Sequence, residues 1–154
     1  FPYTTLFRSE TVLFDLWKAG RYREHTVEDA VRVCAKIVPV FENAGIPIIR
    51  LGLNPTDDLS GGDAAGGAYH PALGELVRSR ILLEQAETLL SGVEPESDVV
   101  LGVRRRLVSQ LTGQHGCNKK ALCGRFALRS LRIRGTDAEN DEIEILSVAK
   151  RADL

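Results

Sequence analysis

The chain has 154 residues, 44% of them hydrophobic and 27% charged, which is ordinary for a globular protein of one or two small domains. The formal net charge is −1 and no apolar run approaches the roughly 20 residues of a membrane span, so we expect no membrane partner. Three cysteines (Cys34, Cys117 and Cys123) show neither a disulfide rhythm nor zinc-ligand spacing, which favours free thiols, a cytoplasmic location and no metal site.

The first nine residues, FPYTTLFRS, match one reading frame of a common short-read sequencing adapter. We therefore interpret residues 1–9 as an artefact and exclude them from the expected fold. On this interpretation the natural sequence starts at Glu10, and the chain is the C-terminal fragment of a longer protein whose N-terminal part is a missing partner. The alternative is a natural N-terminal strand with aromatic ends.

Two helices are predicted next. The first covers residues 11–19. The second follows Thr26, a favourable N-cap with Asp29 at the third helical position, and runs to Asn43. Pro39 lies inside this second helix and predicts a kink or a break there.

A strand and a third helix complete the first unit. Residues 46–53, IPIIRLGL, form the nearly continuous apolar run that is typical of a strand buried on both faces of a parallel sheet. A glycine-rich loop over 54–69 precedes a helix that starts after Pro71 and runs to about Leu90. Helix followed by buried strand indicates an α/β fold. His70 and Glu75 are candidate site residues near the start of the third helix, although a helix-cap role for His70 is the simpler alternative.

A linker over 91–97 leads to a second unit over 98–149. Its predicted order is strand, helix, loop, helix, strand, strand, over residues 98–103, 104–111, 113–116, 117–126, 128–133 and 143–148. The loop reads GQHG and lies between two helices, which resembles the Gly-x-x-Gly loop with which KH domains clamp a nucleic-acid backbone. We therefore expect a small KH-like unit of mixed α and β structure.

Basic residues concentrate in this second unit. From Leu101 to Arg134 there are nine cationic residues and no acid, and acids then return over 137–144. Such a stretch indicates an anionic partner such as RNA. The candidate RNA-binding residues are Arg104, Arg105, Arg106, Gly113, Gln114, His115, Gly116, Lys119 and Lys120. The alternative is a helical hairpin whose arginines are solvated or dock on another domain.

Four segments together resemble one family. They are TVLFDLWKAGRY (11–22), AGIPIIRLGLNPT (44–56), AYHPALGELVRSR (68–80) and VSQLTGQHGCNKKAL (108–122). They are similar to segments of radical S-adenosylmethionine (SAM) proteins related to the Elongator catalytic subunit, in the bacterial branch without an acetyltransferase domain. The chain departs from that pattern at Asn54, where the family has Gln, and at Ala68 and Leu73, where it has Pro and Phe.

The resemblance implies a parent enzyme that holds a [4Fe-4S] cluster through a Cys-x-x-x-Cys-x-x-Cys loop and cleaves SAM, with tRNA as the expected substrate. That loop would lie upstream of Glu10, so the fragment alone would hold neither cofactor, contain no catalytic residue and be inactive. Residues 10–90 would end a parallel α/β barrel and place Arg50, Gly52 and Asn54 near the cofactor. The alternative is a non-catalytic RNA-binding or scaffold module.

Overall fold

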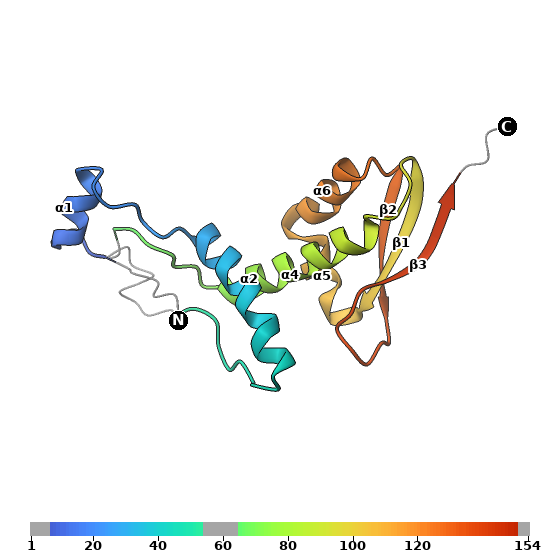
Figure 1. Cartoon of the computed structure of the whole chain (residues 1–154), viewed down its shortest axis with the longest axis horizontal. Helices are drawn as coiled ribbons and strands as arrows, with labels where there is room; N and C mark the ends of the chain where they lie inside the picture. The colour runs from blue at the N-terminus through green and yellow to red at the C-terminus, as the bar shows by residue number, and fades with distance from the viewer. Residues whose placement is uncertain (1–6, 54–64, 151–154) are drawn as a thin grey trace. The chain divides into compact units, whose positions relative to one another are not determined.

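The computed structural model describes residues 7–53 and 65–150 (Figure 1). The chain divides into two compact units, Phe1–Val77 and Arg78–Leu154. Within the described residues there are five α-helices and one three-stranded sheet, which confirms the mixed α and β class. In this part of the chain no helix combines the length and the apolar character needed to cross a membrane. The domain limits given above stay a prediction.

The first two helices form as predicted. Helix α1 covers Val12–Lys18, and helix α2 covers Val27–Asn43. Thr26 and Asp29 make a reciprocal capping box at the start of α2, because each side chain accepts a hydrogen bond from the other residue's backbone N–H. Helix α2 continues through Pro39 to Asn43, so the proline does not end it.

The strand predicted over residues 46–53 is not formed, and that prediction was wrong. The segment has no regular secondary structure, and Ile49 is 98% exposed. A strand requires a neighbour that accepts and donates backbone hydrogen bonds. Among the described residues of the first unit, the β-pairing is limited to an isolated bridge between Phe7 and Gly66, which offers this segment no partner.

Phe7 packs into the first unit, although it belongs to the nine residues that we excluded from the expected fold. Its side chain is only 3% exposed, and its backbone pairs with Gly66 and Ala65. Its ring lies 5.8 Å from that of Trp17 and 5.9 Å from that of Tyr22, between ring centroids. Excluding the whole segment from the fold was therefore wrong as far as Phe7 is concerned.

Helix α4 covers Leu73–Leu90, as predicted to within a few residues. The second unit then follows the predicted order. It contains β1 (Ser97–Arg104), η1 (Arg105–Leu107), α5 (Val108–Thr112), η2 (Gln114–Gly116), α6 (Cys117–Arg125), β2 (Ser130–Thr136) and β3 (Glu144–Lys150). Strand β1 is central, parallel to β2 and antiparallel to β3, with a bulge between Val100 and Leu101.

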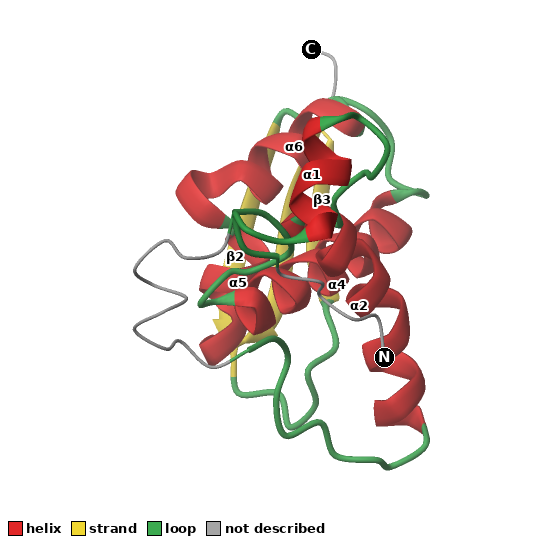
Figure 2. Cartoon of the chain, turned by 90° about the vertical axis from the view of Figure 1, so that its left-hand side faces the viewer, coloured by secondary structure: helices red, strands yellow, loops and turns green. Residues whose placement is uncertain are grey.

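One face of this sheet carries the core of the second unit. Figures 1 and 2 show α5 and α6 on the same side of the strands. Alternate residues of β1, namely Val99, Leu101 and Val103, are fully buried, as the period of two along a strand requires. They pack with Leu90, Leu111, Leu122 and Leu131, among others, in one hydrophobic cluster. The second unit therefore has a core of its own.

Candidate functional site

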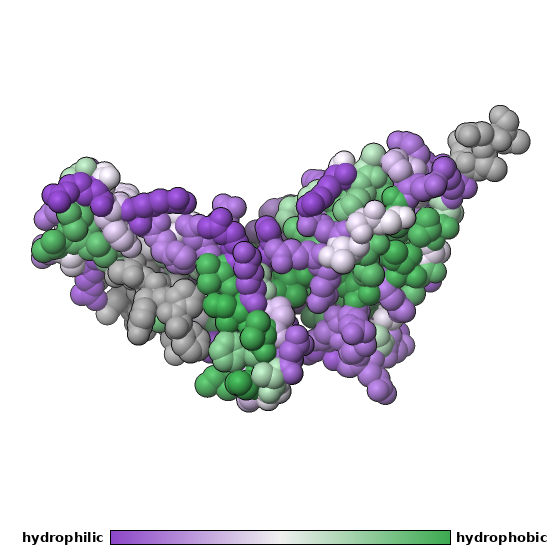
Figure 3. All heavy atoms as spheres, in the orientation of Figure 1, coloured by the Kyte–Doolittle hydropathy of each residue, from purple (hydrophilic) through white to green (hydrophobic). Residues whose placement is uncertain are grey.

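A largely apolar groove of about 340 Å³ lies in the first unit, between α2 and the segment 46–53. Figure 3 shows hydrophobic residues gathered over this part of the molecule. Among the described residues that line the groove, one is charged, namely Arg50. Its other lining residues are Ala30, Cys34, Ile37, Val38, Phe41, Ile46, Pro47, Ile48, Ile49, Leu51, Gly52, Leu53 and Leu73.

Two of the three cofactor-site candidates line this groove. Arg50 is exposed there, and Gly52 has a φ of +87°. A Cβ at Gly52 would approach Leu73 Cδ2 at 3.1 Å, so a glycine lets the chain pass close to that side chain. Asn54 lies outside the described residues. The expectation that Arg50 and Asn54 share a face rested on the alternation of a strand, which this segment does not form.

The segment 46–53 is apolar, and most of its backbone groups lack a backbone partner among the described residues. Within the described ranges, the backbone of residues 47–53 makes no hydrogen bond to another backbone group. Ile46, Ile49 and Leu53 are all exposed. An apolar wall with unpaired N–H and C=O groups fits an extended polypeptide partner better than a charged small molecule.

The cysteines do not fit an iron–sulfur cluster. Cys34 lies in α2, whereas Cys117 and Cys123 lie in α6. Burial raises the pKa of the Cys34 thiol, which disfavours the thiolate that metals and electrophiles require. Over the described residues, no three His, Cys, Asp or Glu side chains gather into a set that would hold a metal ion.

His70 takes a local structural role. Its Nδ1 accepts a hydrogen bond from the backbone N–H of Ala72 at 3.1 Å, just before α4 begins. This geometry favours the helix-cap alternative for His70. Glu75 is exposed in the first turn of α4. Neither residue belongs to the lining of the apolar groove.

The GQHG loop of the second unit forms a tight turn between α5 and α6. Gly113 and Gly116 have φ values of +77° and +74°, and His115 has a φ of +52°. A Cβ at Gly113 would lie 2.8 Å from the backbone nitrogen of Asn118, whereas a Cβ at Gly116 would meet nothing within 4 Å. Gly113 is therefore needed for packing, and Gly116 faces open space.

Polar groups are exposed around this open side of the loop. Gln114, His115, Lys119 and Lys120 are all exposed. Gly116 is the N-cap of α6 and supplies no side chain to its first-turn N–H groups. The structure therefore brings the RNA-binding candidates of the loop together with those of the first turn of α6, beside backbone N–H groups that no side chain caps.

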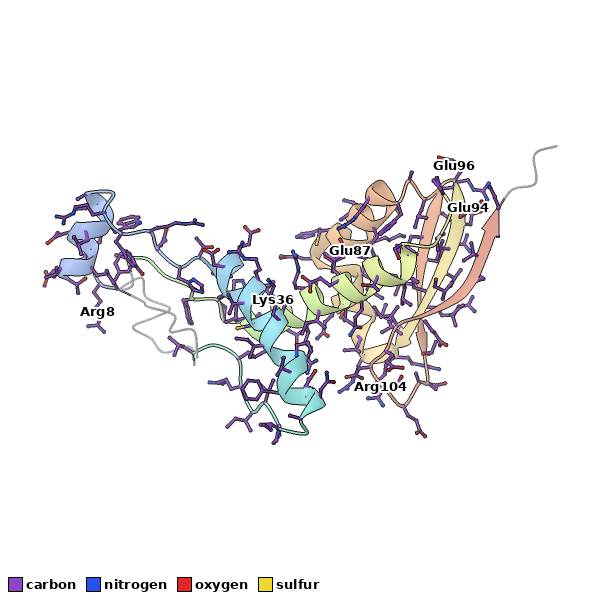
Figure 4. All side chains as sticks on the ribbon, in the orientation of Figure 1. Arg8, Lys36, Glu87, Glu94, Glu96 and Arg104 are labelled. Carbon is purple, nitrogen blue, oxygen red and sulfur yellow. The ribbon has the colours of Figure 1, made fainter. Side chains whose placement is uncertain are left out.

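The three remaining RNA-binding candidates form an arginine triad, Arg104 to Arg106, that binds an acidic turn formed by residues 137–141. Arg104 lies at the end of β1 (Figure 4) and donates to the carbonyls of Ala138 and Glu139. Its Nη1 also lies 3.1 Å from Asp141 Oδ1. The backbone of the turn therefore occupies part of the guanidinium of Arg104.

The other two arginines of the triad pair with carboxylates of the turn. Arg105 Nε lies 3.0 Å from Asp137 Oδ1. Arg106 Nη2 donates to both carboxylate oxygens of Asp141, at 2.8 and 2.7 Å. The hydrogen bond from Arg106 holds the pKa of Asp141 below its usual value, with smaller contributions from the charges of Arg106, Arg104 and Arg78. Sequence reasoning treated the basic and acidic blocks as separate and missed this pairing.

Two more of the nine cations are also paired. Arg125 lies 2.6 Å from Glu87, and Arg129 pairs with Asp98. Lys119, Lys120, Arg132 and Arg134 have no ion-pair partner among the residues that the structure describes. Five of the nine cations are therefore paired with acids from other parts of the sequence, and Lys119 and Lys120 are unpaired cations beside the GQHG loop.

Residues 3–82, more than half of the chain, match the radical SAM C-terminal domain family. The chain belongs to this family. The match contains the apolar groove and begins within the first nine residues, but it does not reach the GQHG loop or the arginine triad. No curated protein and no solved structure shows a significant match to this chain.

Proposed function

We propose that this chain is the C-terminal part of a radical SAM enzyme of the Elongator-like branch, and that its first unit completes the barrel of that enzyme. The observation that carries this proposal is the apolar segment 46–53 inside the family-matched region, because the backbone of its residues 47–53 has no backbone partner among the described residues. Unpaired backbone N–H and C=O groups beside exposed isoleucines can pair with a strand from another domain. An upstream radical SAM domain would supply that strand.

In this proposal the cofactors belong to the parent protein. SAM and a [4Fe-4S] cluster supply the radical chemistry when bound, and a cysteine loop outside this chain holds the cluster. Arg50, Gly52 and Asn54 would face the cofactor side once the segment 46–53 has joined the sheet. The isolated chain would then have no turnover, because the residues that hold the cluster would lie outside it.

Co-expression with the coding sequence that precedes residue 10 in genomic DNA tests this assembly. The two polypeptides should co-purify, and Ile49→Asp should abolish the association because it places a charge in the middle of the proposed interface. Val12→Asp is the matched control, because Val12 is also exposed but lies outside the groove. Equal loss with both variants, or an upstream sequence without a three-cysteine loop, would contradict the proposal.

Iron and sulfide reconstitution of the isolated chain gives a second test. The chain alone should take up no stoichiometric cluster, because its three cysteines do not have the Cys-x-x-x-Cys-x-x-Cys spacing of a cluster loop. A stoichiometric [4Fe-4S] spectrum from this polypeptide would exclude the assignment of the cluster to an upstream loop.

We further propose that the second unit binds tRNA through the GQHG loop. Support comes from the open space at Gly116 and from Lys119 and Lys120, whose side chains are exposed and lack ion-pair partners among the described residues. Backbone N–H groups and cations at the start of α6 are suited to phosphate contacts. The arginine triad would add to this surface when it is not paired with the acidic turn.

Filter binding of tRNA over a range of salt concentrations tests the RNA proposal. Lys119→Glu/Lys120→Glu should weaken binding and reduce the salt dependence by about 0.7–0.9 per lost cation. Gly116→Asp should also weaken binding, because it places a carboxylate where the phosphate would lie. Lys36→Glu, on helix α2, is the control for a change of charge elsewhere, and it should have little effect.

The second candidate function is a non-catalytic RNA-binding or scaffold module. The separate core of the second unit favours it, because that unit buries a hydrophobic cluster of its own. Salt-dependent tRNA binding, combined with an upstream gene segment that lacks a cluster motif, would select this alternative.

A further inference from the structure

We infer that the acidic turn, residues 137–141, is a tethered competitor that masks the arginine triad from a nucleic-acid backbone. The inference rests on the proposed RNA-binding function and concerns the regulation of that site. Its starting point is that the arginines and the acids meet although 31 or more residues separate them in the sequence.

Sheet topology explains why they meet. Strands β1 and β2 are neighbours and run parallel, with Arg104 opposite Thr136 in the register. Parallel strands end at the same edge of a sheet, so the triad that follows β1 and the turn that follows β2 leave that edge together. The fold of the second unit therefore brings the arginine triad and the acidic turn together.

The contacts imitate those that a phosphate would make. Arg106 engages both oxygens of one carboxylate, and Arg104 engages two carbonyl oxygens and the same carboxylate. Guanidinium groups bind phosphate oxygens through the same N–H donors. While the turn is in place, these donors of Arg104 and Arg106 are occupied.

The mask is nevertheless reversible. The side chains of Arg105 and Asp137 are 73% and 83% exposed, and exposed ion pairs are weak and screened by salt. Residues 137–143 contain no helix or strand, so the turn can move without breaking a ladder of the sheet. A polyanion with several phosphates can therefore replace the turn, whereas isolated anions compete poorly with a tethered one.

A matched set of charge variants tests the inference. Asp141→Asn and Asp137→Asn/Asp141→Asn release arginines of the triad. Glu94→Gln and Glu87→Gln/Glu94→Gln make the same changes in net charge, but they release Lys150 and Arg125 instead. Glu94 lies at the opposite end of the sheet from Arg104 (Figure 4). All variants are compared by tRNA filter binding over a salt series, with far-UV circular dichroism to check the fold.

The released arginines should raise tRNA affinity at low salt by roughly three- to tenfold per freed cation and steepen the salt dependence by about 0.7–0.9 each. The control variants, Glu94→Gln and Glu87→Gln/Glu94→Gln, should gain less than half as much tRNA affinity. Adding Arg106→Gln to Asp141→Asn should cancel most of the gain, because it removes the arginine that binds both oxygens of Asp141, whereas Arg104 still donates to the carbonyls of the turn. If Asp141→Asn lowers stability, Asp137→Asn alone gives the same test through the more exposed Arg105 pair.

The outcomes separate this inference from the proposed function. Equal affinities for Asp141→Asn and Glu94→Gln overturn the mask, even if Lys119→Glu/Lys120→Glu shows that the loop binds tRNA. Binding by Asp137→Asn/Asp141→Asn, without binding by the wild type, supports the mask and overturns the loop as the main site. Absence of binding in every variant overturns both.

Discussion

The side-chain amide of Asn118 donates a hydrogen bond to the hydroxyl of Ser79, with 2.9 Å between Nδ2 and Oγ, and so joins the first turn of α6 to α4. The same amide lies 3.3 Å from the backbone carbonyls of Ser79 and Gln110, and Asn118 is only 7% exposed. One buried amide in the turn that follows the GQHG loop thus connects α4, α5 and α6.

Asn118→Ala should lower the free energy of unfolding of the second unit by about 1–3 kcal/mol, because it removes a buried amide and its hydrogen bonds to Ser79 and Gln110. Urea denaturation followed by far-UV circular dichroism measures the change. Lys119→Ala is the control at the next residue, and as an exposed substitution it should stay within about ±0.5 kcal/mol. Equal effects of the two substitutions would show that the amide is not a structural link.

Alanine substitutions at the two loop glycines should differ, although both glycines have positive φ. Gly116→Ala should cost about 1–2 kcal/mol from backbone strain alone. Gly113→Ala should cost a further ~1–3 kcal/mol, because the new Cβ would overlap Cys117 Sγ and the backbone of Asn118 at 2.7 and 2.8 Å. Urea unfolding of both variants gives the comparison, and a larger loss at Gly116 would contradict it.

Local signals predicted much of the fold. The order of elements in the second unit was predictable from the spacing of apolar residues, which alternates in strands and repeats every three to four residues in helices. Each of these patterns can be read from a short stretch of sequence. The segment 46–53 could not be predicted in the same way. Its apolar run indicates burial, but whether a strand forms depends on a partner strand, which the described residues of the first unit do not provide.

The candidate site shows the same limit. The GQHG loop was recognisable because its glycines and flanking helices are adjacent in the sequence. The pairing of Arg106 with Asp141 was not, because it depends on β1 and β2 being parallel neighbours. The sequence does show a basic block directly after one predicted strand and an acidic block directly after another. Predicting that the two blocks meet also requires knowing that these strands are parallel neighbours.

Phe7 offers a test of whether the first nine residues belong to the folded unit. Phe7→Ala should destabilise the first unit by about 3–5 kcal/mol, the usual cost of truncating a buried phenylalanine. Trp17 is the single tryptophan of the chain and lies against Phe7, so its emission should shift to the red. Val12→Ala, at a residue that is 77% exposed, should leave the emission unchanged. An unchanged spectrum for Phe7→Ala would mean that the segment lies outside the fold after all.

The capping box of α2 predicts a dependence of stability on pH. Hydrogen bonds from the Thr26 backbone and hydroxyl, together with the charges of Arg23 and Arg32, hold the pKa of Asp29 below its ordinary 3.8. Because the folded pKa lies below the unfolded one, ionised Asp29 stabilises the folded state. That contribution is complete above pH 3.8 and disappears as the pH falls through the folded pKa.

Thermal unfolding of wild type and Asp29→Asn over this acidic range measures the effect. Asp29→Asn should lower the melting temperature at neutral pH. The difference from wild type should shrink as the pH falls below 3.8 and vanish below the folded pKa, where Asp29 is protonated in both states. Arg32→Gln is the intermediate case. It removes the ion pair at 2.6 Å but keeps both hydrogen bonds from Thr26, so it should retain most of the pH dependence. A difference between wild type and Asp29→Asn that persists unchanged at acidic pH would show that the asparagine acts through packing and not through the lost carboxylate.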